Sequence, residues 1–578
     1  MSRRSSRRVS GRKGLAAARP AGDAGMVGGS RGRAALVRTS VQAALIFLLL
    51  VVAYLANGDI LPGNDATANV RLAGKLVSKH KLVFTPEEDP FMFEWRLKTP
   101  EGERRALFRS WRSSLGGEAI RQVYERGDLS APEPFYYLMK TRFPGVYANR
   151  YGVGAGLLAV PFVAAVYPFA RDFYDRPSAG ILWFSARVAA SCAVAASAVL
   201  LFLAALPWLR PGTATGLALA YGLGTCVWSS SSQTLWQHGP MEFFLALGTY
   251  FLLQRERPRA AYWVGLSYAL AFVCRPTAAL AMAAAAIYYL LRDRRALFRA
   301  VAGALPAALL LAGYNLHYFG TLLVLGQMNI GAAAEASTQL PAEFTLIPMA
   351  MAAPVTPVAA VSRFFGTSLL EGLAGLLLSP SRGLLTFSPA IGFAFWGLVR
   401  AFRDSRFSAL RPVGLAALAL FLVAARWFGW GGGWCYGPRL LVDGVTLLAF
   451  LAIPVAEEIR RRRTLAVAFA VCFTWAVAVQ FVGAFAYDVV GWNERILFVV
   501  KRPGEGKPLF FTDPDEARRE AWARGGSVEQ QKIDVTSELG ESRLWSLRDS
   551  QILYYVEHFS AARKLKQIAI QQFLRDRG

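Results

Sequence analysis

The sequence contains few residues of the types that bind metals or form disulfides. Its 578 residues include four histidines and five cysteines. The cysteines are scattered, and four of them lie inside apolar stretches without ligand spacing, so they predict neither a zinc site nor a disulfide framework. The acidic residues and histidines show no ligand spacing either. We therefore expect no metal and no other cofactor.

Charged residues are also scarce. They make up 18% of the chain, whereas 54% is hydrophobic and the mean hydropathy is +0.32. This balance is too apolar for several soluble domains. Apolar stretches of roughly 18 to 25 residues, the length that crosses a bilayer, recur between Val41 and Tyr487. The sequence therefore predicts an all-α polytopic membrane protein.

The charge that is present is mostly positive, and its placement indicates topology. The 64 Lys and Arg residues outnumber the 39 Asp and Glu residues, for a net charge of +25. Arginines cluster at alternate ends of the apolar segments, as in cytoplasmic loops. The clusters occupy residues 1–38, 255–259, 292–295, 400–406 and 460–463. We predict a bacterial inner-membrane protein with membrane lipids as partners, no nucleic acid, a cytoplasmic N-terminus and a periplasmic or external C-terminus.

Three regions follow from this topology. Residues 1–39 are predicted to be a basic, disordered cytoplasmic tail, residues 40–487 a transmembrane domain, and residues 488–578 a small external domain with a helix near 550–575. Residues 58–150 form the first external loop, with interfacial helices such as 66–79. Residues 151–170 are interpreted as re-entrant or interfacial. About eleven transmembrane helices are expected near residues 41–57, 182–209, 213–231, 241–254, 261–275, 277–291, 301–318, 390–399, 415–428, 440–455 and 465–487.

Two carboxylates, Asp59 and Asp65, follow the first apolar helix in the stretch NGDILPGNDATANVR. A carboxylate at the outer face could accept a proton from an attacking hydroxyl, which is general-base catalysis. The alternative is that Asp65 caps the amphipathic helix that follows, because Asp is a preferred N-cap residue. The residues alone leave both interpretations open.

A histidine and a tryptophan lie at a predicted external turn, in the motif LWQHGP. His238 could bind substrate or tune a carboxylate, with Trp236 beside it. The alternative is an ordinary hydrogen-bonded histidine in a turn.

Three arginines lie at predicted external turns. Arg275 stands in CRPTA, Arg382 in SPSRGLL and Arg439 in WGGGWCYGPRLLVD. Each could hold a phosphate through charge-assisted hydrogen bonds, or could snorkel to the interface. In the third motif, Trp434 and Tyr436 offer flat faces for a sugar ring, or belong to an interfacial aromatic belt. The glycines there favour substrate contact, because they let backbone approach a ligand closely.

Taken in order, these motifs resemble those of the C-type glycosyltransferase superfamily. The resemblance covers residues 41–487 and rests on the first-loop Asp, ANRYGVGAGLLAVPF, SAR, LWQHGP, RPTA, SPSRGLLTFSP and WGGGWCYGPRLLVD. Within the superfamily the chain is similar to bacterial protein-mannosyltransferase-like members that use polyprenyl-phosphate-linked sugars.

The resemblance implies a polyprenyl-phosphate-linked sugar donor, inversion at the anomeric carbon and a lipid, glycan or protein acceptor. It also implies that Asp65 is the catalytic base and that Arg275 holds the donor phosphate. The family pattern has a second acidic residue or a tyrosine close after the Asp, whereas here Ala66 follows. Asp59 therefore remains a second candidate.

Two other classes of protein compete with this interpretation. One is a multispanning transporter or flippase of lipid-linked or envelope glycans, and the other is a noncatalytic membrane subunit. A transporter typically carries polar residues at mid-span and repeated halves. The residues singled out here gather instead at one predicted membrane face, which favours the enzyme.

Overall fold

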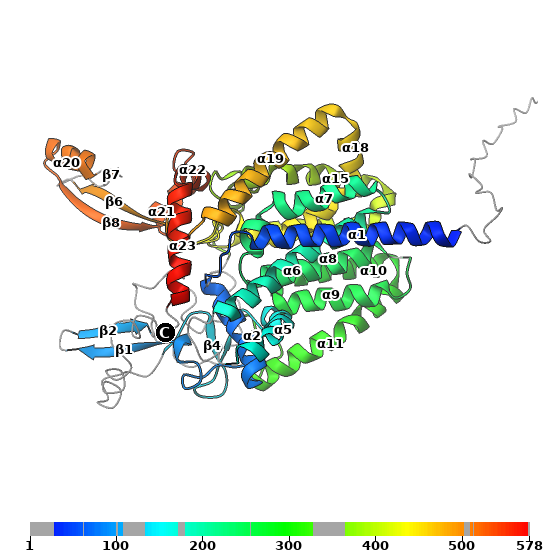
Figure 1. The fold of residues 1–578 in the computed structure, drawn as a ribbon, viewed down its shortest axis with the longest axis horizontal. Helices are drawn as coiled ribbons and strands as arrows, with labels where there is room; N and C mark the ends of the chain where they lie inside the picture. Colours follow the sequence, from blue (N-terminus) through cyan, green and yellow to red (C-terminus); the bar gives the residue numbers. More distant parts are fainter. Residues whose placement is uncertain are drawn as a thin grey trace, which may run out of the picture.

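Long apolar helices form most of the structure (Figure 1). The computed structural model describes residues 28–61, 63–99, 102–107, 133–171, 180–254, 256–326, 365–501, 509–511 and 514–575. Residues 1–27 of the predicted basic tail and residues 327–364 lie outside these ranges, whereas residues 28–39, which were predicted to belong to the disordered tail, are helical as the start of α1.

Each apolar segment predicted to span the membrane is helical over most of its length. The main bundle helices are α1 (Gly28–Leu55), α6 (Gly180–Ala205), α7 (Pro211–Gly224), α8 (His238–Leu253), α9 (Ala260–Cys274), α10 (Ala279–Arg292), α11 (Arg294–Phe319), α15 (Phe393–Arg403), α16 (Arg411–Arg426), α17 (Val442–Leu451), α18 (Ile453–Arg461) and α19 (Arg463–Ala486). Among the described residues, five helices are long and apolar enough to cross a membrane, or six if the bent pair α17 and α18 forms one span. The count of about eleven spans stays a prediction.

Glycines allow two of these helices to pack at very short range. A Cβ atom added to Gly265 of α9 would lie 1.8 Å from the carbonyl oxygen of Ala300 in α11. A Cβ atom added to Gly303 of α11 would lie 2.0 Å from the carbonyl oxygen of Tyr262. Small residues at such contacts let helix backbones approach closely in membranes, where packing replaces the hydrophobic effect as the driving force.

The first loop combines a helix with short strands. The predicted amphipathic helix is present as η1 (Asn64–Ala66) and α2 (Thr67–Lys79), and α2 packs on α5 (Gly154–Val166). The strands were not predicted. Strand β1 (Phe93–Thr99) pairs with β2 (Gly102–Leu107) and β3 (Glu133–Pro134), and β4 (Leu138–Lys140) pairs with β5 (Tyr147–Asn149), all antiparallel.

The described part of the C-terminal segment contains a third small sheet and four α-helices. Strand β6 (Glu494–Lys501) lies between β7 (Leu509–Phe511) and β8 (Ser527–Asp534), beside α20 (Pro514–Ala523). The helix predicted near residues 550–575 is present as α22 (Gln551–Glu557) and α23 (Phe559–Arg575). Both helices contact α19, so the segment is joined to the bundle.

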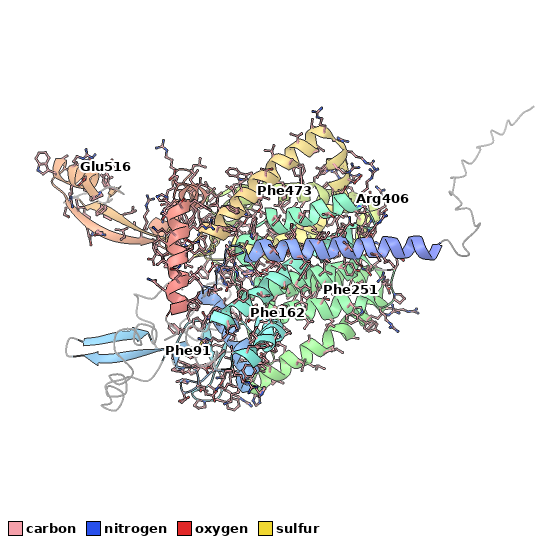
Figure 2. All side chains as sticks on the ribbon, in the orientation of Figure 1. Phe91, Phe162, Phe251, Arg406, Phe473 and Glu516 are labelled. Carbon is pink, nitrogen blue, oxygen red and sulfur yellow. The ribbon has the colours of Figure 1, made fainter. Side chains whose placement is uncertain are left out.

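The two ends of the helix bundle carry different segments of the chain. In Figure 1 the first residues of α1 lie at one end, and the strands of the first loop, the C-terminal sheet and α23 lie at the other. Figure 2 places Arg406, from one of the arginine clusters, at the end opposite to Phe91 of the first loop and Glu516 of α20. The first loop and the C-terminal segment therefore share one end, away from that cluster.

Reporter fusions test which side of the membrane each end faces. We expect alkaline phosphatase to be active when fused after Gly578 and inactive when inserted at Arg406, because α23, the last described helix, lies at the end of the bundle opposite to Arg406. Alkaline phosphatase activity in cells carrying each fusion measures the exposure of that position. An inactive fusion at Gly578, combined with an active cytoplasmic reporter at the same position, would contradict the predicted topology.

Candidate active site

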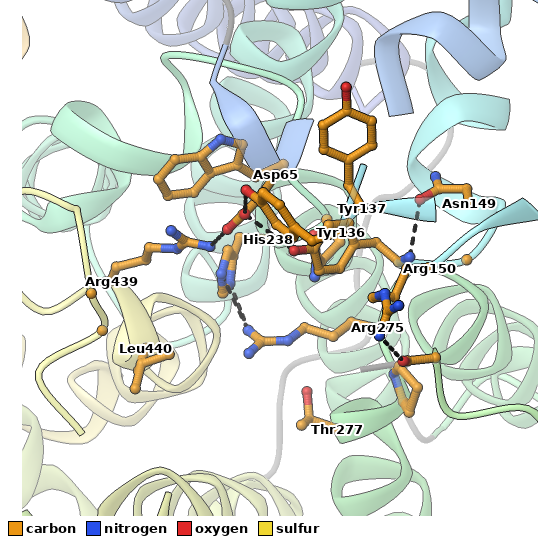
Figure 3. A pocket seen from close by; sticks show the side chains of 18 of the residues that line it. Asp65, Tyr136, Tyr137, Asn149, Arg150, His238, Arg275, Thr277, Arg439 and Leu440 are labelled. Atoms are coloured by element: carbon orange, nitrogen blue, oxygen red, sulfur yellow. Dashed lines mark hydrogen bonds and ion pairs between the residues drawn. The ribbon is translucent and has the colours of Figure 1, made fainter. Parts of the chain in front are cut away.

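A cavity of about 820 Å³ lies at the end of the bundle that carries the first loop. Its wall includes the first loop, the start of α8, the junction of α9 with α10, and part of a glycine-rich turn, residues 431–437, before α17. The cavity is shown from close by in Figure 3. Of the nine site residues predicted from the sequence, six line it: Asp65, Trp236, His238, Arg275, Trp434 and Arg439.

Asp65 is held by three side chains that come from distant parts of the chain. Its Oδ1 accepts hydrogen bonds from the hydroxyls of Tyr136, at 2.7 Å, and Tyr151, at 3.1 Å. Its Oδ2 accepts a hydrogen bond from Arg439. Helix α2 begins after Ala66 without a side-chain cap, so the carboxylate of Asp65 does not cap that helix.

These partners keep the carboxylate of Asp65 ionised. Burial by itself raises the pKa of Asp65, but the positive charge of Arg439 and the hydrogen bonds from Tyr136, Arg439 and Tyr151 lower it, and the net shift is downward. The same surroundings raise the pKa of both tyrosines, through burial first and then through the negative charge of Asp65. Both phenols therefore stay protonated and donate to the carboxylate.

Arg439 lies between Asp65 and the wall of the cavity. Its guanidinium carbon is 3.8 Å from the centroid of the Trp236 ring, a cation–π contact. The first loop passes close to the same ring, because a Cβ atom added to Gly63 would lie 2.8 Å from Trp236 Nε1. The Nε–H of Arg439 is buried and meets no acceptor among the described residues. Part of its donor capacity is therefore unused by the described residues.

Arg275 lies on another part of the same wall. Its backbone is extended, with φ −156° and ψ 125°, as expected for a residue before proline, and this conformation ends α9. Its Nη1 lies 2.7 Å from Nδ1 of His238 and donates to Asp443, which is also 3.1 Å from His238 Nδ1. Its Nε–H, like that of Arg439, is buried without an acceptor among the described residues.

Asp59 lies outside the lining of the cavity. Its carboxylate is 2.7 Å from Lys566 of α23 and 3.9 Å from Arg187 of α6, and it accepts a hydrogen bond from the amide of Leu61. Burial raises its pKa, but Lys566 and Arg187 outweigh burial and the net shift is downward. Asp59 therefore links the first loop to the C-terminal helix, whereas Asp65 faces the cavity.

Of the remaining predicted site residues, one lines the cavity and two are buried outside its lining. Trp434 lines the cavity, and its indole N–H donates to Asp534 at 2.9 Å. Tyr436 and Arg382 are buried outside the lining. The hydroxyl of Tyr436 donates to the carbonyl oxygen of Val479 in α19, at 3.0 Å.

Three residues at the site were not predicted to belong to it: Tyr136, Tyr151 and Asp443. Tyr151 stands in the motif ANRYGVGAG and Asp443 in GPRLLVD, four residues after Arg439. Both signals were therefore present in motifs already singled out. Tyr136 precedes a three-residue strand that the sequence pattern did not reveal. Among the described residues, no group of three or more His, Cys, Asp or Glu side chains could hold a metal ion.

Comparisons with known proteins find similar solved structures but no sequence match. No protein-family model and no curated protein sequence matches the chain. The structure is similar to the crystal structure of ArnT from Cupriavidus metallidurans bound to undecaprenyl phosphate, with a TM-score of 0.44 and 13% sequence identity. The similarity covers 78% of this chain and 66% of the ArnT chain. This chain therefore spans just under two thirds of the length of that ArnT chain.

Proposed function

We propose that the chain is an inverting glycosyltransferase that moves a sugar from a polyprenyl-phosphate donor to an acceptor hydroxyl at the external face of a bacterial inner membrane. One observation carries the proposal. An ionised carboxylate, Asp65, lines the same cavity as Arg275 and Arg439, whose buried Nε–H groups find no acceptor among the described residues. A base and two cations with spare donors suit attack on a phosphate-linked sugar.

The proposed reaction is one displacement. The acceptor oxygen attacks the anomeric carbon and forms the new glycosidic bond, while the bond from that carbon to the phosphate oxygen breaks. The proton of the acceptor hydroxyl passes to Asp65, and the bonding electrons leave with the polyprenyl phosphate. Attack from the side opposite to the phosphate inverts the anomeric carbon.

The proposed leaving group explains why one carboxylate suffices. A phosphate departs as an anion and needs cationic neighbours more than a protonating acid. Arg275 and Arg439 can supply that charge, and each retains an N–H donor for a phosphate oxygen. The apolar wall beside them, with Leu420, Val423 and Ala424 of α16, suits the first units of a polyprenyl chain.

A transfer assay tests the function directly. Membranes containing the protein would be incubated with a panel of radiolabelled polyprenyl-phosphate sugars, and label would be followed into lipid, glycan and protein. Label in a new covalent product supports the proposal and identifies the acceptor class. Movement of intact donor across sealed vesicles without a new product would favour a transporter or flippase instead.

The two tyrosines predict how the reaction depends on pH. Loss of a hydrogen bond to the ionised carboxylate raises its pKa. Because the protonated form of Asp65 is inactive as a base, activity is lost as pH falls through that pKa. We therefore expect Tyr136→Phe and Tyr151→Phe each to move the acid limb of the kcat/KM profile to higher pH.

Transfer rates measured across the acidic range check this expectation. A suitable control is Tyr314→Phe, because Tyr314 lines the same cavity and its buried hydroxyl makes no hydrogen bond with Asp65 or any other described residue. An acid limb that stays in place in both tyrosine variants would mean that Asp65 does not set the profile.

A further inference from the structure

Arg382 was predicted to bind substrate, but its donors are fully used inside the protein. Its Nε donates to Gly431 O at 2.7 Å, and its Nη2 donates to Gly433 O at 3.0 Å. Its Nη1 and Nη2 also donate to Ser381 O, to Gln551 Oε1 and to Asn493 Oδ1, at 3.1, 2.6 and 3.3 Å. A guanidinium has five N–H donors, and these five bonds account for all of them. Arg275 and Arg439, by contrast, each have an Nε–H without an acceptor among the described residues.

Gln551 completes the set of contacts from the C-terminal segment. This residue begins α22 and is fully buried. Its Oε1 accepts a hydrogen bond from the amide of Gly437 at 2.9 Å, and its Nε2 donates to the carbonyl oxygen of Cys435 at 2.8 Å. The backbone N–H of Gln551 donates to Ser381 Oγ at 3.1 Å.

The segment held in this way is the glycine-rich turn, residues 431–437. Gly432, Gly433 and Gly437 have φ values of 76°, 67° and 64°, which a residue with a side chain rarely adopts. The turn has no regular hydrogen-bond ladder of its own. Two buried side chains, Arg382 and Gln551, instead bind three of its carbonyls and one of its amides.

We propose that Arg382 and Gln551 are positioning residues that fix the glycine-rich turn and thereby hold Trp434 and Arg439 at the cavity. Trp434 lies within the turn, and Arg439 follows it by two residues. The C-terminal segment is then an integral part of the site, because it contributes Gln551. The inference rests on the proposed function at one point, which is the role of Arg439 in binding the phosphate of the sugar donor.

The kinetic test uses Arg382→Lys. An ammonium is a point charge and cannot reach the carbonyl oxygens of Gly431 and Gly433 together with Gln551. We expect the donor KM to rise about tenfold with a smaller change in kcat, because Arg439 would be displaced from the phosphate. The rise should be absent when Arg439 is already Gln, since the two residues act through one contact.

Arg543→Lys is the matched control. Arg543 is also buried and stacks on Trp492, the ring that Arg382 covers, but the side chain of Arg543 donates to Asp549 and not to the turn. This variant should lower thermal stability without changing the donor KM. Equal KM values in the Arg382→Lys and Arg543→Lys variants would overturn the kinetic part of the proposal.

A second readout does not depend on catalysis. Cys435 lies in the turn and is fully buried, with Sγ 3.5 Å from the carbonyl oxygen of Gly437. Maleimide labelling followed by mass spectrometry measures its accessibility. We expect slow labelling of Cys435 in the wild type and Arg543→Lys, and at least tenfold faster labelling in Arg382→Lys and Gln551→Ala.

The two readouts separate the two proposals. If no donor supports transfer by the wild type, the proposed function fails, while labelling of Cys435 still tests whether Arg382 and Gln551 hold the turn. If transfer occurs but both readouts match those of Arg543→Lys, the positioning inference fails and the proposed function stands.

Discussion

Replacing Asp65 with Asn is expected to lower the transfer rate by about 10²- to 10⁴-fold, the usual contribution of a positioned general base. Asn has nearly the shape of Asp, and the hydroxyls of Tyr136 and Tyr151 can accept as well as donate hydrogen bonds, so the variant should fold. Its amide cannot take the acceptor proton. Initial rates at saturating donor, together with donor affinity, would show a loss of kcat with binding retained.

Asp59→Asn is the informative control for this experiment. Asp59 is the other carboxylate of the first loop, but it lies outside the cavity lining and pairs with Lys566 and Arg187. Its substitution should reduce stability and leave the chemical step nearly intact. Near-normal transfer by Asp65→Asn with none by Asp59→Asn would make Asp59 the base. Activity in both variants would remove the main support for an enzyme.

Substituting Arg275 or Arg439 with Ala is expected to weaken donor binding. A hydrogen bond to a charged group contributes about 1.5–3 kcal/mol, which corresponds to roughly 10- to 150-fold in affinity. The effect of Arg439→Ala should include a second component. Asp65 would lose its cationic partner, so its pKa should rise and the acid limb should move to higher pH. Equilibrium binding of a labelled donor and the pH profile measure the two components.

Arg426→Ala is a matched control for the loss of positive charge. Arg426 ends α16 and binds the backbone carbonyls of Thr367 and Phe365, and its side chain is exposed and outside the cavity lining. Its removal should leave donor affinity unchanged. Unchanged affinity in the Arg275 and Arg439 variants as well would favour the alternative in which these arginines snorkel to the interface.

The helices were the most predictable part of the fold. Hydropathy located them because a bilayer requires long apolar segments whose backbone is satisfied within the segment. The amphipathic pattern also located α2. Strands β4 and β5 were missed because they have only three residues each, too few for an alternating pattern to emerge.

The candidate site was only partly predictable. Motifs at turns pointed to Asp65, His238, Arg275 and Arg439, and these four residues line one cavity. Their pairing could not be read from the sequence, because Arg439 lies 374 positions from Asp65. The supporting role of Arg382 could not be read from the sequence either. An arginine beside turn residues looked the same in all three motifs, and only the count of occupied donors distinguished support from a cavity-facing cation.

The contacts of α22 and α23 also bear on how the protein is made. A ribosome synthesises the chain from its N-terminus, so the loop with Asp59 and the glycine-rich turn emerge well before Gln551 and Lys566. These parts gain their last partners only when the final described helix has been translated and delivered to the same side of the membrane. A nascent chain with every bundle helix inserted would still lack an assembled site. Release of the chain between Ala486 and Gln551 would therefore leave the bundle helices without the contacts that Gln551 and Lys566 make with the turn and the first loop.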